Sequence, residues 1–273
     1  MTQNDSSDYS PDYSPDYSSL DRPEILACLF HPRPETGFRP GRADREDLEI
    51  TVDQDVVIHA SLHLADREGP LILFFHGNGE IVSDYDDLGR FFSDMGINFL
   101  VADYRGYGAS SGTPTVEAMM TDAHSVLDFV LDYRQNKGMP GPVCIMGRSL
   151  GSAPAIELAA SRPDDMDCLI IESGFAFTGP LLRVLGIDPD RVGFSAAPGG
   201  ENVDKIRSFV KPCLVIHAEY DHIIPFSDGQ ALYEAAGSEE KRLYEVKGAN
   251  HNDIFLRGMT DYLAQVRRIC FSR

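Results

Sequence analysis

The sequence predicts an α/β fold: a mostly parallel sheet of about eight strands with helices on both faces. Short, unbroken apolar runs, typical of strands that are buried on both sides, alternate with longer amphipathic stretches that suit helices. The chain has 273 residues, of which 42% are hydrophobic. That length and composition suit one large α/β domain with a substantial core.

An acidic, low-complexity segment comes before the predicted domain. The unit Asp-Tyr-Ser-Pro at residues 8–11 repeats at 12–15 and begins again at 16. A segment of this composition cannot bury a core, so we predict a disordered tail over residues 1–20, with the domain at 21–273. A tyrosine-bearing interaction tag is the alternative interpretation of the repeat.

Regular structure is predicted to start near Leu48. Alternating apolar residues in Leu48–Val52 and Val56–Leu64 indicate two antiparallel strands around a turn. The buried strands that follow are predicted at Leu71–Phe75, Asn98–Ala102, Val143–Met146, Cys168–Ile171, Cys213–His217 and Leu243–Val246. The helices are predicted at Asp84–Met95, Thr115–Arg134, Ser149–Ser161, Phe226–Ala236 and Asn252–Ile269.

One interval, Gly174–Ser208, is longer than a single crossover helix needs and is rich in bulky apolar residues. It is predicted to form a short cap over the carboxyl edge of the sheet. Phe175, Phe177 and Leu182 are its candidate substrate-binding residues, lining an apolar pocket. A crossover helix with a long loop is the alternative.

The candidate nucleophile is Ser149. It lies in Gly147-Arg148-Ser149-Leu150-Gly151, a G-x-S-x-G pattern between a predicted strand and a predicted helix. In that context the turn is a nucleophile elbow, which lifts the serine hydroxyl above the sheet edge. The flanking glycines keep side chains out of a crowded turn.

A serine nucleophile needs a base and a carboxylate that orients the base, in the chain order serine, acid, histidine. Asp221 follows one predicted strand and His251 follows the next, both at the edge where the serine lies. His251 is preferred over the seven other histidines. Glu219 and Glu172 are the rivals of Asp221 for the role of the acid.

An oxyanion also needs preorganised N–H donors. The Leu150 N–H follows the nucleophile at a helix start, and the Gly-rich loop 76–80 follows an early strand. Asn78 is predicted to supply the second donor, with Gly79 as the alternative.

Five motifs in this order resemble the α/β-hydrolase superfamily, and within it the serine-aminopeptidase-like and α/β-hydrolase-domain serine hydrolases. They are His76–Gly79, Asp103–Ser110, Gly147–Gly151, Glu219–Pro225 and Gly248–Asn252. The resemblance covers roughly Leu48 to Cys270 and implies a Ser-Asp-His triad; some members are thioesterases acting on acylated proteins. The chain departs from the usual pattern at Ala249, where a glycine is common.

Net charge and cysteine spacing argue against several kinds of ligand and partner. The formal net charge of −19 argues against nucleic acid and anionic membrane surfaces. No apolar stretch approaches the ~20 residues of a membrane helix, and no signal peptide is visible, so a cytoplasmic location is expected. The five cysteines lack metal-site spacing, and neither a metal nor an organic cofactor is expected.

The sequence therefore predicts a serine hydrolase that cleaves a carboxylic ester or thioester through an acyl-enzyme. Its expected substrate is a small or acylated molecule with an apolar portion. The alternatives are a serine peptidase or aminopeptidase, and a non-catalytic ligand-binding protein on the same fold. Neither the natural substrate nor the oligomeric state follows from the sequence.

Overall fold

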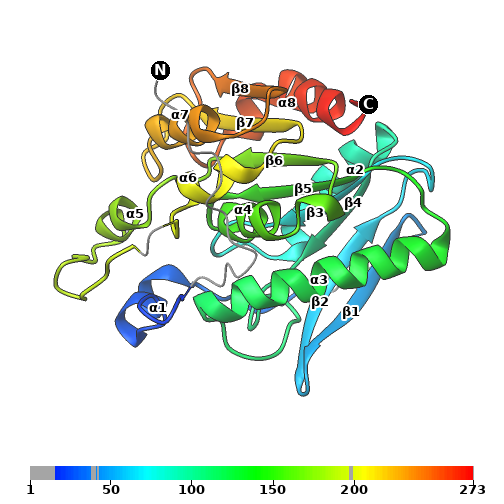
Figure 1. Ribbon diagram of the computed structural model, residues 1–273. Helices are drawn as coiled ribbons and strands as arrows, with labels where there is room; N and C mark the ends of the chain where they lie inside the picture. The colour runs from blue at the N-terminus through cyan, green and yellow to red at the C-terminus, as the bar shows by residue number, and fades with distance from the viewer. Residues whose placement is uncertain (1–15, 38–40, 42, 197–198, 273) are drawn as a thin grey trace.

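The computed structural model describes residues 16–37, 41, 43–196 and 199–272, and it has an eight-stranded sheet over these residues (Figure 1). The strand order is β1-β2-β4-β3-β5-β6-β7-β8; β1, β2 and β4 pair antiparallel, and the other neighbours are parallel. The strands are β1 Arg45–Asp53, β2 Val56–His63, β3 Leu71–Phe75, β4 Asn98–Ala102, β5 Val143–Arg148, β6 Cys168–Glu172, β7 Cys213–Ala218 and β8 Lys241–Val246. The predicted fold class is confirmed.

Helices cover both faces of the sheet. Successive side chains of a strand point to opposite faces, so strands that are apolar throughout need a covering layer on each face. Leu73 and Ile145 belong to the core beneath α3 and α4, whereas Phe74 and Met146 belong to the core beneath α2 and α8. Figure 1 shows α3 and α4 in front of the strands. The α-helices are α1 Pro23–Leu29, α2 Asp86–Asp94, α3 Val116–Lys137, α4 Ser152–Ser161, α5 Thr178–Val184, α6 Asn202–Lys205, α7 Phe226–Ala235 and α8 Ile254–Cys270. The 3₁₀ turns are η1 Val82–Tyr85, η2 Ser149–Gly151, η3 Pro163–Asp165 and η4 Ile206–Ser208.

The longest helix, α3, has clear start and stop signals. The Thr115 hydroxyl accepts a hydrogen bond from Ala118 N at 3.0 Å, which caps the first turn. Gly138 ends the helix with φ +63°, a left-handed conformation that glycine adopts without strain. The helix thus runs three residues beyond the predicted end at Arg134.

The strand order determines where a crevice opens at the carboxyl edge of the sheet. β3 lies between β4 and β5, so the chain leaves β3 toward one side of the sheet and returns to its other side at β5. The loops after β3 and β5 therefore diverge and leave a crevice at the carboxyl ends of these strands, where open α/β sheets bind ligands.

The N-terminal region differs from the prediction that structure starts near Leu48. Pro23–Leu29 forms α1, and Ile25 and Leu29 are buried in the main core. Part of the predicted tail also contacts the domain, because Tyr17 OH donates a hydrogen bond to Glu157 Oε2 at 2.7 Å. Residues 16–20 thus lie on the domain, and residues 1–15 lie outside the described residues.

The predicted cap interval contains two kinds of structure. α5 and the chain after it extend away from the sheet (Figure 1). α6 and η4 instead pack against α4 and form the crossover toward β7. The cap is therefore confined to the first part of Gly174–Ser208, and both sequence interpretations apply to portions of it.

Candidate active site

Ser149 stands in a strained turn between β5 and α4. Its φ of +51° lies in the left-handed region that side chains rarely adopt. The turn also requires both flanking glycines: a Cβ on Gly147 would lie 2.1 Å from the Gly151 carbonyl oxygen, and one on Gly151 would lie 2.1 Å from the Phe75 carbonyl oxygen. The strand-to-helix turn is thus as tight as the sequence pattern suggests.

The three residues predicted as nucleophile, base and acid lie within hydrogen-bonding distance in series. His251 Nε2 is 3.0 Å from Ser149 Oγ, and His251 Nδ1 is 2.7 Å from Asp221 Oδ2. A carboxylate only accepts, so Nδ1 carries the proton, and Nε2 of the neutral ring is free to accept the serine proton. This arrangement can deprotonate a serine that attacks a carbonyl carbon.

Asp221 is held and kept charged by its surroundings. Its Oδ1 accepts hydrogen bonds from Ile223 N at 3.0 Å and Ile224 N at 2.9 Å. Burial of the side chain opposes ionisation, but the hydrogen bond and charge of His251 and the two backbone donors outweigh it, so the pKa of Asp221 is lowered.

Glu219 and His217 have other hydrogen-bond partners, although His217 Nε2 also lies 3.6 Å from Asp221 Oδ2. Glu219 accepts from Gly248 N at 2.8 Å and faces Lys247. His217 is fully buried, and its Nε2 donates to the Ile224 carbonyl at 2.8 Å. His217 is therefore a core histidine, as its position inside a strand predicts.

The loop after β3 brings Asn78 to the same crevice. The Asn78 side chain is fixed, since its Oδ1 accepts from His31 N at 2.9 Å and from Tyr107 OH at 2.7 Å. Within the described residues its backbone N–H has no hydrogen-bond acceptor. Asn78 and Leu150 both line the cavity beside Ser149, whereas Gly79 does not. The two residues predicted to supply the oxyanion donors thus line one cavity.

A partly buried ionic cluster at one side of the site was not anticipated. Arg148 forms ion pairs with Glu80 and, at 2.9 Å, with Glu172, its cross-strand neighbour on β6. Its Nη2 also donates to the His251 carbonyl at 2.9 Å. Glu80 Oε2 in turn accepts from Gly77 N at 2.6 Å. One guanidinium therefore joins the elbow, the loop after β3 (the predicted oxyanion loop) and the loop that carries His251 (the histidine loop).

Glu80 keeps its negative charge because of Arg148. Burial opposes the charge of Glu80, but the neighbouring guanidinium outweighs it, with help from the hydroxyl of Tyr85, so the pKa of Glu80 is lowered. Glu172 accepts a hydrogen bond from Tyr262 OH at 2.6 Å. The sequence places Glu172 at the end of a predicted strand and an arginine in the elbow, but these two positions do not reveal that the side chains pair.

The catalytic cavity has a volume of about 200 Å³, and its lining is partly apolar. The cap contributes Phe175 to the wall, while Leu182 lines a neighbouring cavity that also reaches Phe175. Phe177, at the start of α5, is 39% exposed and lines neither cavity, so the predicted role for it is not supported. Leu29 of the unpredicted α1 lines both cavities.

Three buried thiols also come together, although their sequence spacing gives no sign of it. The sulfur atoms of Cys144, Cys168 and Cys270 lie within 4.8 Å of one another. Cys144 and Cys168 lie near the starts of β5 and β6, at the opposite edge of the sheet from Ser149. They are therefore not part of the candidate active site.

Comparison with known proteins supports the fold. The family model for serine aminopeptidase, S33, matches residues 67–185. Alpha/beta hydrolase domain-containing protein 17B of Homo sapiens is 36% identical over 203 residues, which are 72% of this chain and 65% of that protein. Protein bem46 of Schizosaccharomyces pombe is 25% identical over 237 residues, 81% of this chain and 77% of that protein. The chain thus spans about 65% of the length of the human relative.

Solved structures share the architecture at low sequence identity. The Pyrococcus furiosus esterase Pf2001 superposes with a TM-score of 0.69 at 18% identity, covering 88% of this chain and 98% of that one. Est1E from Butyrivibrio proteoclasticus, with ferulic acid bound, gives a TM-score of 0.66 at 17% identity, covering 83% of this chain and 100% of that one. With the strand order, the elbow and the sequence relatives taken together, the chain belongs to the α/β-hydrolase superfamily.

Proposed function

We propose that the chain is a serine hydrolase that cleaves a carboxylic ester or thioester through an acyl-enzyme intermediate. The observation that carries the proposal is the series Ser149, His251 and Asp221 at 3.0 and 2.7 Å beside a partly apolar cavity. Structural neighbours that include esterases and a monoacylglycerol lipase from Paleococcus ferrophilus support ester chemistry.

In the proposed first half-reaction, Ser149 Oγ attacks the carbonyl carbon while its proton passes to His251 Nε2. Asp221 stabilises the imidazolium ion through Nδ1. Collapse of the tetrahedral intermediate breaks the bond from carbon to the leaving oxygen or sulfur, and Nε2 returns the proton to that leaving group. Water then attacks the acyl-enzyme, with His251 as the base, and releases the acid and free Ser149.

The tetrahedral intermediate carries a negative oxygen, and the Asn78 and Leu150 N–H groups are its proposed donors. Leu150 lies at the start of the helical segment formed by η2 and α4, where backbone dipoles favour an anion. The fixed Asn78 side chain holds the other donor in place before substrate binds, so little reorganisation accompanies the reaction.

The test is a fluorophosphonate probe together with p-nitrophenyl esters. The wild-type protein should be labelled at Ser149 and should hydrolyse the esters, and Ser149→Ala should lower kcat by about 10³-fold or more. Unchanged ester turnover in Ser149→Ala would exclude the proposed nucleophile. A folded wild-type protein that neither labels nor turns over would instead fit a ligand-binding role.

An aminopeptidase is the second candidate, favoured by the description of the matching family. A free substrate amino group would need an unpaired carboxylate near Ser149. Glu80 and Glu172 lie on one side of the site, but Arg148 pairs with both. This pairing favours an ester or thioester. Faster turnover of aminoacyl-naphthylamides than of esters would reverse that preference.

A further inference from the structure

A second cavity, of about 70 Å³, adjoins the catalytic cavity. The two share four apolar wall residues, which are Leu29, Leu150, Phe175 and Leu181. Beyond them, α3 contributes Val116, Met119 and Met120, and the cap contributes Leu182 and Phe194. The second cavity therefore continues the apolar surface that begins at Ser149, and its flexible methionines can adapt to an alkyl chain.

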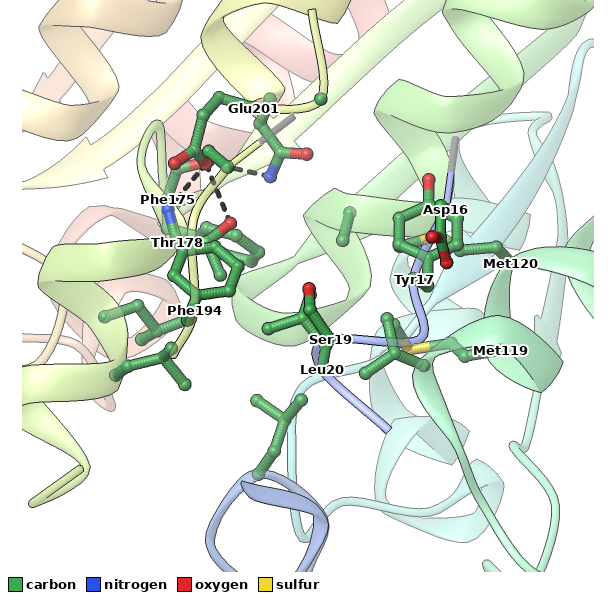
Figure 2. A pocket seen from close by; sticks show the side chains of 18 of the residues that line it. Asp16, Tyr17, Ser19, Leu20, Met119, Met120, Phe175, Thr178, Phe194 and Glu201 are labelled. Atoms are coloured by element: carbon green, nitrogen blue, oxygen red, sulfur yellow. Dashed lines mark hydrogen bonds between the residues drawn. The ribbon is translucent and has the colours of Figure 1, made fainter. Parts of the chain in front are cut away.

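The N-terminal segment Asp16–Leu20 forms the outer wall of this second cavity. Figure 2 shows Tyr17 and Leu20 next to Met119 and Met120, across the space from Phe194. Tyr17 and Leu20 are partly buried and pack against the main core. The wall is thus supplied by the chain that the sequence suggested to be a solvated tail.

This wall is fastened at both ends. Tyr17 OH donates to Glu157 Oε2 at 2.7 Å and accepts from Lys205 Nζ at 2.7 Å. Lys205 and Glu157 form a 2.8 Å ion pair whose side chains are only 1% and 5% exposed, so Tyr17 completes a buried charged site. At the other end, Asp21 accepts from Val116 N at 2.6 Å at the start of α3.

The opposite wall is also fixed. Glu201 Oε2 accepts hydrogen bonds from Thr178 N at 2.7 Å and from Thr178 Oγ1 at 2.8 Å (Figure 2). Asn202 Nδ2 donates to the Phe175 carbonyl at 3.0 Å. These bonds tie the cap to the start of α6, so the space between the cap and the N-terminal segment has a defined width.

We propose that the two cavities form one acyl-binding channel and that the segment Asp16–Leu20 closes its far end and limits the length of acyl chain that is cleaved. The inference rests on the proposed function and adds a substrate class to it: an ester or thioester of a linear aliphatic acid. The acyl chain runs from the Ser149 carbonyl past Leu150 and Phe175 toward Met119. Leu20 is the residue that an over-long chain meets.

The test compares a larger and a smaller side chain at Leu20. In Leu20→Trp the larger side chain fills the channel end, so kcat/KM for the p-nitrophenyl dodecanoate should fall at least tenfold relative to the butyrate, since one misplaced methylene costs 10-fold or more. Leu20→Ala opens the end and should raise the same ratio. Leu256→Trp, at a position that is 82% exposed on α8, is the matched control and should leave the ratio within twofold.

The outcomes separate the two proposals. If the wild type hydrolyses esters and both Leu20 variants keep the wild-type ratio, the channel is wrong while the serine hydrolase stands. If neither esters nor short and long alkyl fluorophosphonates react with wild type, both fail. Met119→Trp narrows the same end from α3, so it decides the matter if Leu20→Trp does not fold: a lowered ratio supports the channel, and an unchanged one overturns it.

Discussion

Removing the guanidinium of Arg148 should damage stability and catalysis together. The substitution Arg148→Met keeps an unbranched side chain but leaves Glu80 and Glu172 without their shared cation. It also removes the 2.9 Å hydrogen bond to the His251 carbonyl. The histidine loop then loses its link to the elbow, so both the folded state and the alignment of His251 should suffer.

The magnitude follows from the burial of the cluster. The side chains of Arg148 and Glu172 are 12% and 7% exposed, so an uncompensated carboxylate there falls in the class that costs about 3–5 kcal/mol. Glu80 is 26% exposed and keeps Gly77 N, and Glu172 keeps Tyr262 OH. These remaining partners favour the lower end, about 3 kcal/mol, which corresponds to roughly 6–12 °C in Tm.

The loss of folding stability in Arg148→Met should depend on pH. The pKa of Glu80 is lowered in the folded protein, so its contribution is present above the unfolded-state value and disappears as pH falls through the folded value. Without Arg148 the largest favourable cause of the lowered pKa is lost, and only weaker ones such as Tyr85 OH and Gly77 N oppose the cost of burying the charge of Glu80. The stability difference between wild type and Arg148→Met should therefore be larger at pH 7 than near pH 4.

The assay is urea unfolding at both pH values, with kcat on a short ester. Arg162→Met is the matched control, since Arg162 pairs with the exposed Asp128 and Asp165 and its loss should cost less than about 1 kcal/mol. Arg148→Lys restores the charge without the planar fork and should recover part of the stability. A loss in Arg148→Met equal to that in Arg162→Met, or a loss independent of pH, would refute the reasoning.

Three further predictions concern the triad, the N-terminal segment and the buried thiol of Cys213. Asp221→Asn should lower kcat by about 10³–10⁴-fold with little change in KM, because the amide no longer fixes the His251 tautomer; a loss confined to KM would contradict this. Deleting residues 1–15 should leave Tm unchanged, whereas Tyr17→Phe should cost about 1–3 kcal/mol in urea unfolding, since the hydroxyl bonds two buried charged groups; equal effects would contradict the docked segment. Burial raises the pKa of Cys213 to about 12, so iodoacetamide at pH 8 should modify Cys213 only after unfolding, as mass spectrometry can check.

Local sequence signals sufficed for the sheet and for the turn at Ser149. Strands buried on both faces must be apolar throughout, and an elbow with two close backbone contacts must have glycine at positions 147 and 151, so both leave direct marks in the sequence. The loops that carry Asp221 and His251 could be placed by the rule that parallel strands end at one edge. Their hydrogen bond joins residues 30 positions apart, and only the fold fixes its length.

The features that escaped prediction depend on packing between distant segments. Pro23 and Glu24 at the start of α1 are valid helix signals, but the helix has seven residues and is stabilised by burying Ile25 and Leu29 in the core. The repeat that includes Tyr17 suggested disorder from composition alone. A partner for Tyr17 exists because α4 and α6 bring Glu157 and Lys205 together, a pairing that no local pattern encodes.

The same long-range packing gives the site one charged side and one apolar side. Arg148 and its two carboxylates hold the elbow, the oxyanion loop and the histidine loop as a unit, and a charged cluster of this kind has few alternative arrangements. On the opposite side, Leu20 and Met119 border the second cavity with apolar side chains, whose size should set how much room a substrate has. Substitutions near the cluster should therefore change kcat for every substrate, whereas those in the second cavity should change which substrates are preferred.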